Sequence, residues 1–224
     1  MTALLVVLCL ILIVTIDLGR LWWHKRHEAA APGGARVRPF AALGFPRGLF
    51  LDHSHTWLRL TDSGELRVGV DELLAQAMDG ADRMELPASG AKVTRGQPLA
   101  TLWRRDHKLV VPSPVDGTVV TSNHALTHYV HDLEEDPYGA GWLACVWPTE
   151  HREALKALSV GEGARQWLQR EVARFADFMA AHTGRTSVGM ALADGAHPVV
   201  GAALHLDDSD WRVFQREFAS IREN

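Results

Sequence analysis

The chain has 224 residues, of which 47% are hydrophobic and 22% charged, proportions typical of a folded globular protein. Its formal net charge of −4 argues against a general nucleic-acid binder, which would be strongly basic. The two cysteines, Cys9 and Cys145, lie in an apolar run and in a predicted strand, far apart in sequence. This spacing argues against a disulfide framework and against a cysteine zinc site.

Residues 3–23 form an almost continuous apolar segment. A helix that crosses a bilayer takes about 20 residues, so this segment is long enough. Trp22 and Trp23 at its end suit the lipid headgroups, and Lys25 and Arg26 follow at once. A cleaved signal peptide is the less favoured alternative, because no basic residue precedes the segment. The positive-inside rule then predicts a single-pass protein of the inner membrane, with its N-terminus outside and the bulk of the chain cytoplasmic.

Residues 28–48 mix Ala, Pro, Gly and Arg without a period and are interpreted as a linker. From Phe50 to Pro148, short apolar runs alternate with Gly-rich and Pro-rich turns, which is typical of a small sandwich or barrel. The runs 57–60 and 66–70 predict a hairpin, and Asp71 can cap a short helix through Met78. Further strand-like runs are 84–87, 98–103, 109–111, 118–121 and 142–147.

The C-terminal part has helical character. Apolar residues recur at helical spacing over 162–182, which predicts an amphipathic helix. Two strand-like runs follow, 187–192 and 199–206, and Asp207 to Ser209 can cap a last helix through Phe218. The predicted fold is α+β and mainly β. The predicted parts are a transmembrane helix with its basic flank (1–27), the linker (28–48), a β-domain (49–150) and a helix–hairpin–helix module (151–224).

Several short motifs follow one another in the β-domain. They are Ser54-His55-Thr56-Trp57, Val68-Gly69-Val70, Glu85-Leu86-Pro87 with Gly90 and Gly96, Ser113-Pro114-Val115-Asp116-Gly117, Asn123 with Ala125-Leu126, and Asp136-Pro137-Tyr138-Gly139-Ala140-Gly141-Trp142. In this order they resemble the glycine cleavage system H protein family, a relative of lipoyl and biotinyl domains. The resemblance implies a barrel-sandwich hybrid of two small β-sheets.

The resemblance also implies where a lipoyl arm would be attached. In the family, the lipoyl lysine lies at a hairpin tip seven residues before the position of Ser113, and Asp106 stands there in this chain. Lys108 lies two residues further on, roughly 6–7 Å along a strand and off the tip. Arg104 and Arg105 also make the flank of the site basic. We therefore expect no lipoyl cofactor, with attachment at Lys108 as the open alternative.

Other residue clusters are incomplete as sites. His124, His128 and His131, and the pair His53 and His55, have no further ligands that would complete a metal site. The chain has no P-loop, dinucleotide fingerprint or nucleophile elbow, so an enzyme is not predicted. The residues expected to contact a partner are those at the altered tip: Trp103, Arg104, Arg105, Asp106 and His107.

Two functions remain in competition. The first is a non-catalytic accessory subunit of an integral membrane complex of respiratory or photosynthetic type, which presents a non-lipoylated H-protein-like domain at the cytoplasmic face beside the lipid bilayer. The alternative is a membrane-tethered lipoyl carrier protein modified at Lys108. A periplasmic adaptor is a weaker third idea, because the lipoyl-like motif contains no helical hairpin.

Overall fold

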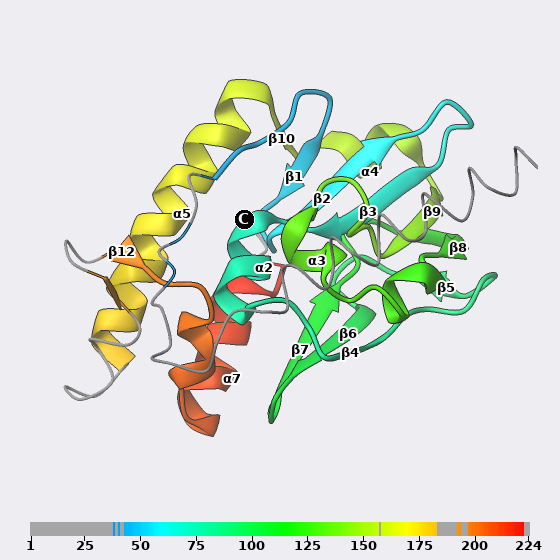
Figure 1. Cartoon of the computed structure of the whole chain (residues 1–224). Helices are drawn as coiled ribbons and strands as arrows, with labels where there is room; N and C mark the ends of the chain where they lie inside the picture. Colours follow the sequence, from blue (N-terminus) through cyan, green and yellow to red (C-terminus); the bar gives the residue numbers. More distant parts are fainter. Residues whose placement is uncertain are drawn as a thin grey trace, which may run out of the picture. The chain divides into compact units, whose positions relative to one another are not determined.

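The computed structural model describes residues 38, 40, 43–156, 158–182, 192–193 and 197–221, all within one compact unit that begins at residue 37. Most elements are short antiparallel strands (Figure 1). The strands are β1 (Phe50–Asp52), β2 (Thr56–Leu60), β3 (Leu66–Val70), β4 (Arg83–Glu85), β5 (Lys92–Val93), β6 (Pro98–Arg104), β7 (His107–Pro112), β8 (Gly117–Ser122), β9 (Ala144–Pro148), β10 (Ser159–Val160), β11 (Leu192–Ala193) and β12 (His197–Pro198). The helices are α2 (Glu72–Met78), η1 (His124–Thr127), α3 (Asp132–Glu135), α4 (His151–Lys156), α5 (Gly161–His182), η2 (Ala202–His205) and α7 (Asp208–Phe218).

The strands form two main sheets. One has seven strands in the order β10-β1-β2-β3-β9-β8-β5, and the other has three in the order β4-β6-β7. A larger hydrophobic core joins α2, the inner side of the three-stranded sheet, α5 and α7. A smaller core lies under the seven-stranded sheet around Leu58, Val68 and Val146. The fold is thus mixed and mostly sheet, in agreement with the predicted class.

Several elements agree closely with the sequence patterns. The predicted hairpin is β2 paired with β3, with Leu60 opposite Leu66. Asp71 caps α2, since its carboxylate accepts a hydrogen bond from the Leu74 amide at 3.1 Å. Asp207 caps α7 in the same way through the Ser209 and Asp210 amides. Short polar side chains at these positions satisfy amides that a helix leaves unpaired at its start.

The predicted strand over 199–206 is wrong, because the chain there turns into η2. Gly201 adopts a positive φ of 77°, and its amide donates to the carbonyl of Gln76 at 2.8 Å. This contact packs the turn against α2, where an extended strand would not fit. The neighbouring run 187–192 lies outside the described residues except for Leu192, which begins β11.

The predicted transmembrane segment, with Trp22, Trp23, Lys25 and Arg26, lies outside the described residues. Within the described ranges, no helix combines the length and the apolar character needed to cross a bilayer. The longest helix, α5, has 22 residues, but only part of its surface is buried.

Gly69 allows Trp57 to lie flat on the neighbouring strand. The two residues are directly opposite in the β2–β3 pair, and a Cβ at residue 69 would lie 2.6 Å from the indole ring. The indole is fully buried, and its N–H donates to the Pro137 carbonyl at 3.0 Å. The ring is thus enclosed on several sides and cannot move away.

We predict that Gly69→Ala destabilises the protein by about 1–3 kcal/mol, because the new methyl group overpacks the core. Urea unfolding measures this change. Gly163→Ala is the matched control, since a Cβ at that helical position of α5 meets no atom within 4 Å. The control should be neutral or slightly stabilising, because alanine favours a helix more than glycine does. Equal effects of the two substitutions would contradict the prediction.

Candidate functional site

The hairpin that corresponds to the lipoyl-bearing hairpin of the resembling family is formed by β6 and β7. Arg104 pairs with His107, so Arg105 and Asp106 make a two-residue tip. Arg105 has a positive φ of 52°, which the tight reversal requires. The structure therefore places Asp106 at the tip and Lys108 on the strand, as the residue count predicts.

One side of the tip is held by two acidic residues between α2 and β4, Asp79 and Asp82. Asp82 accepts hydrogen bonds from the Arg105 amide at 2.7 Å and from the Arg104 guanidinium at 2.6 Å. The amide and then the two arginine charges lower the pKa of Asp82. Arg104 also pairs with Asp79 at the end of α2. Two of the residues predicted as partner contacts, Arg104 and Arg105, are thus partly engaged within the chain.

The other side of the hairpin is held by the C-terminal module. Trp211 of α7 donates from its indole N–H to the Lys108 carbonyl at 2.8 Å, and its ring stacks on His107 with centroids 4.3 Å apart. The Gln215 side-chain oxygen accepts a hydrogen bond from the Val110 amide at 3.3 Å. His107 Nε2 lies 3.3 Å from the Leu204 carbonyl oxygen. Because β7 is an edge strand, these contacts satisfy backbone groups that would otherwise be unpaired.

The outer face of the three-stranded sheet presents an aromatic residue between two cations. Arg83, Trp103 and Lys108 stand side by side on β4, β6 and β7. The Arg83 guanidinium lies 4.0 Å and the Lys108 ammonium 5.8 Å from the Trp103 ring centroid. Both cations are exposed, and the indole is partly exposed. These side chains are available for contact with another molecule.

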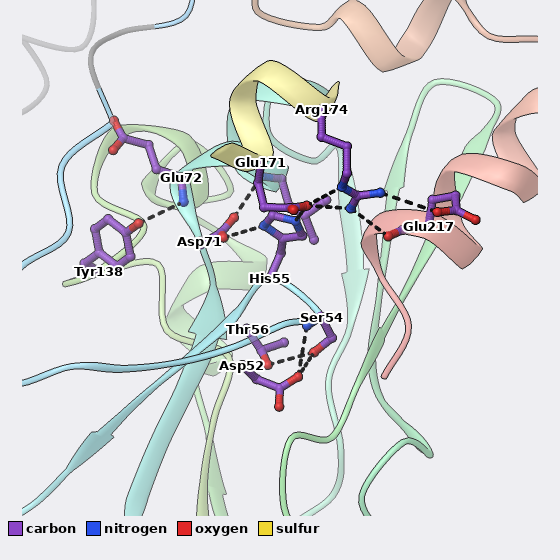
Figure 2. A network of polar contacts seen from close by, with 11 residues as sticks. Asp52, Ser54, His55, Thr56, Asp71, Glu72, Tyr138, Glu171, Arg174 and Glu217 are labelled. Carbon is purple, nitrogen blue, oxygen red and sulfur yellow. Dashed lines mark hydrogen bonds and ion pairs between the residues drawn. The ribbon is translucent and has the colours of Figure 1, made fainter. Parts of the chain in front are cut away.

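A buried network of charged groups joins the C-terminal helices to the β-domain (Figure 2). His55, in the turn between β1 and β2, directs Nδ1 to Asp71 at 2.6 Å and Nε2 to Glu171 of α5 at 3.3 Å. Arg174, one turn further along α5, donates from Nε to Glu171 at 2.7 Å and from a terminal nitrogen to the Glu217 carbonyl at 3.0 Å. The network thus connects β1–β2, α2, α5 and α7.

Burial by itself would lower the pKa of His55, but the adjacent Asp71 and Glu171 carboxylates outweigh it and raise the pKa to about 9. Burial by itself would raise the pKa of Glu171, but hydrogen bonds from His55 and Arg174 outweigh it and lower the pKa to about 2. At neutral pH the network therefore contains an imidazolium between two carboxylates. Both ring nitrogens then act as donors.

His55 holds the fold together and does not perform chemistry on a substrate. Its side chain is 0% exposed, and both nitrogens are occupied by carboxylates of the same chain. A general acid or base must reach the proton that it transfers on the substrate. His55 has no such access.

The sequence contained only weak signals for this network. His55 is part of a family motif, and Asp71 is recognisable as a helix cap. Glu171 falls three residues after Leu168 and four before Phe175, on the buried stripe of α5. A carboxylate in that position indicates a buried partner, but the spacing does not say which residue is the partner.

The histidines considered for a metal do not gather into a site. His124, His128 and His131 are exposed residues around η1 and the start of α3. In the part of the chain that the structure describes, no group of three ligating side chains is arranged to hold a metal ion.

The comparisons with known proteins identify the domain. The family model described as glycine cleavage H-protein matches residues 49–171, more than half of the chain. The chain belongs to the glycine cleavage H-protein family. The match spans the β6–β7 hairpin and ends at Glu171, inside α5. The second half of α5 and all of α7 therefore lie beyond the part that the family shares.

Individual H proteins are similar to more than half of the chain. The chain is 28% identical to glycine cleavage system H protein 2 of Aquifex aeolicus over 140 residues, which covers 62% of the chain and 87% of the relative. It is 36% identical to a probable glycine cleavage system H protein 2 of Sulfolobus acidocaldarius over 122 residues, which covers 54% of the chain and 80% of the relative. A crystal structure of the Mycobacterium marinum H protein aligns with a TM-score of 0.48 and 25% identity, covering 57% of this chain and 98% of that one.

The predicted localisation as a single-pass protein of the inner membrane is wrong. The matched relatives are glycine cleavage H proteins by name, and none of the helices described here can cross a bilayer. The long helix of this H-protein-family chain, α5, packs its apolar stripe on the protein core through Leu168, Phe175 and Met179. A spanning helix would instead be apolar around its whole circumference.

The raised pKa of His55 predicts a loss of stability at alkaline pH. A group with a folded-state pKa above its unfolded value stabilises fully below the unfolded value, here 6.5. That contribution declines as the pH rises toward about 9 and is absent above it. We expect the wild-type protein to lose up to about 3 kcal/mol of unfolding free energy through this group between pH 6 and pH 10.

Urea unfolding at several pH values measures this loss. His55→Asn removes the titrating group and tolerates the positive φ at this position, so its stability should vary less over the same range. His128→Asn replaces an exposed histidine and serves as the control. A wild-type pH dependence that persists in His55→Asn would show that another group is responsible.

Proposed function

We propose that this chain is a non-catalytic member of the H-protein family that presents a hairpin without a lipoyl group to a protein partner. The observation that supports the proposal is the two-residue tip of the β6–β7 hairpin, which consists of Arg105 and Asp106. A lipoyl arm needs an amine at that place, and neither residue supplies one. The proposed role is therefore contact, not transfer of a bound group.

The surroundings of the tip support a fixed hairpin. Asp82 holds the Arg105 amide, and Trp211 and Gln215 hold the backbone of β7. The segment with Trp211 and Gln215 lies beyond the residues that match the family. An addition that immobilises the hairpin suits a docking element more than the base of a swinging arm, because a rigid contact surface loses less entropy on binding.

The row Arg83, Trp103 and Lys108 is the surface that we propose for the contact. Tryptophan and arginine are the residues most enriched among those that dominate the energy of protein interfaces. Trp103 already contacts cations from both neighbouring strands, which favours one orientation of its ring before a partner arrives. The inner face of the same sheet is occupied by core residues such as Leu102 and Leu109.

A lipoyl carrier modified at Lys108 is the second candidate. Two observations favour it: the relatives are named as glycine cleavage H proteins, and the Lys108 side chain is exposed near the tip. Against it, the Lys108 carbonyl is bound by Trp211, and its ammonium lies beside Trp103. The attachment reaction would need that ammonium to leave the indole.

Intact mass spectrometry separates the two candidates. The full chain is produced in cells supplied with lipoate and a lipoate-attaching enzyme, together with a glycine cleavage H protein as the positive control. We predict that the wild-type chain stays unmodified. Asp106→Lys restores an amine at the tip and should gain the mass of one lipoyl group. A wild-type adduct that disappears in Lys108→Arg would refute the main proposal and establish the second candidate.

Co-purification tests the contact itself. We predict that the tagged wild-type chain, isolated after mild cross-linking in its native cells, retains a partner in defined stoichiometry. Trp103→Ser should lose most of that partner, because truncation of a central interface tryptophan typically costs 2 kcal/mol or more, about a 30-fold change in affinity. Tyr129→Ser is the matched control, since Tyr129 is an aromatic residue that is 59% exposed just after η1, outside the three-stranded sheet. Recovery of the wild-type chain alone, or equal loss in both variants, would contradict the proposal.

A further inference from the structure

Two arginines stand directly opposite each other on the seven-stranded sheet. Arg59 of β2 pairs with Arg67 of β3, and Arg67 in turn is opposite Cys145 of β9. Cross-strand partners direct their side chains to the same face. The alternating residues Leu58 and Val68 point the other way, into the smaller core. The two guanidinium groups therefore share one face of the sheet.

No ion pair among the described residues neutralises this pair of arginines. Like charges directly opposite each other destabilise a sheet. Across the residues that the structure describes, no ion pair joins a carboxylate to Arg59 or Arg67, whereas Arg95, Arg104 and Arg174 each pair with an acidic residue. Glu65 contributes an opposing charge near Cys145 but forms no ion pair with either arginine in that set. Within the described residues, the repulsion between the two arginines is thus not balanced by an ion pair.

The two arginines are nevertheless held in place. Arg59 donates to the Tyr138 carbonyl at 3.1 Å, and the Arg67 guanidinium lies 5.1 Å from the Trp142 ring centroid. The loop that supplies both contacts is itself fixed by Asn123, which donates to the carbonyls of Ala140 and Trp142 at 2.8 and 2.9 Å. The Nε atom of Arg67 is buried and has no acceptor among the described residues. A buried donor without an acceptor costs free energy.

Activation of Cys145 does not explain Arg67. The guanidinium does interact with the thiol and acts to lower its pKa, but burial dominates and raises the pKa of Cys145 above its ordinary value. The thiol is 3% exposed and stays protonated at neutral pH. The placement of two arginines opposite each other therefore needs another explanation.

We propose that Arg59 and Arg67, both partly exposed, form a binding site for an oxyanion, a phosphate or a carboxylate group, on the face of β2 and β3 that also carries Trp57. The planar guanidinium offers paired N–H donors that match the oxygens of both groups. An anion between the two arginines removes their repulsion. The proposal is independent of the proposed function, because this site lies on the seven-stranded sheet and the hairpin on the three-stranded one.

The neighbouring surface is compatible with an oxyanion that belongs to a larger molecule. Trp147 lies two residues after Cys145 on β9 and is 49% exposed. Val120 of the adjacent β8 is 40% exposed. Free phosphate would use the arginines alone, whereas an acidic peptide would also cover these apolar side chains.

Arginine side-chain NMR on the full-length chain tests the site. The probes are inorganic phosphate and a short glutamate peptide, each titrated at constant ionic strength against chloride. The Nε–H signal of Arg67 should shift saturably with at least one probe. Arg67→Gln should abolish the saturable binding, which is then followed through the Nε–H signal of Arg59. Arg59→Gln should weaken the affinity by about tenfold, because one charged donor is lost. Saturation by phosphate identifies phosphate, and saturation by the peptide alone identifies a protein carboxylate.

A control and a stability measurement separate binding from a purely structural role. Arg170→Gln replaces an exposed arginine of α5 and should bind both probes as the wild type does. In chloride alone, Arg67→Gln should unfold at the same or a higher temperature than the wild type, because the repulsion is relieved. Shifts that are equal in phosphate, peptide and chloride, or that persist in Arg67→Gln, would overturn the proposal.

Discussion

The charged network around His55 is the interaction on which the arrangement of this chain depends. An imidazolium that is 0% exposed lies between Asp71, the cap of α2, and Glu171 of α5. Replacing a buried ion pair by apolar groups is often neutral or favourable, so such a network is not justified by stability alone. The relevant property of the network is that its hydrogen bonds require His55, Asp71 and Glu171 to meet in one geometry. Loss of either carboxylate would leave one nitrogen of the buried imidazolium without its acceptor, which favours the observed orientation of α5.

The position of the hairpin follows from the position of α5. Arg174 extends the network from Glu171 to the end of α7, where its guanidinium also lies 3.9 Å from the Phe218 ring centroid. The start of α7 then brings Trp211 against β7. His55, which lies within the residues that match the family, is thereby linked to a helix outside the match, and that helix holds the β6–β7 hairpin. The segment beyond the family match therefore contacts the hairpin whose tip carries Asp106.

On the proposed function, the chain combines a shared domain with a different use of its surface. Membership of the H-protein family describes residues 49–171. It does not by itself assign a lipoyl group, because the same fold can support other functions. The hairpin row around Trp103 and the arginine pair at Arg59 and Arg67 lie on different sheets. The two surfaces can consequently serve different contacts without interference.

The sequence by itself determined the β-rich domain, its family, the β2–β3 hairpin, both capped helices and the tip position of Asp106. These features depend on residues close together in the chain: alternation within a strand, a cap beside its helix, or a short count between two motifs. The strand predicted over 199–206 was wrong, because contact between Gly201 and α2 overrides the local pattern. The tertiary structure alone decided that Glu171 meets His55, that Trp211 holds Lys108 and that Arg59 faces Arg67. The first two pairs are separated by 116 and 103 residues, and only packing of the whole domain brings such distant side chains together. The third is close in sequence, but whether the two arginines lack a countercharge depends on every element around them.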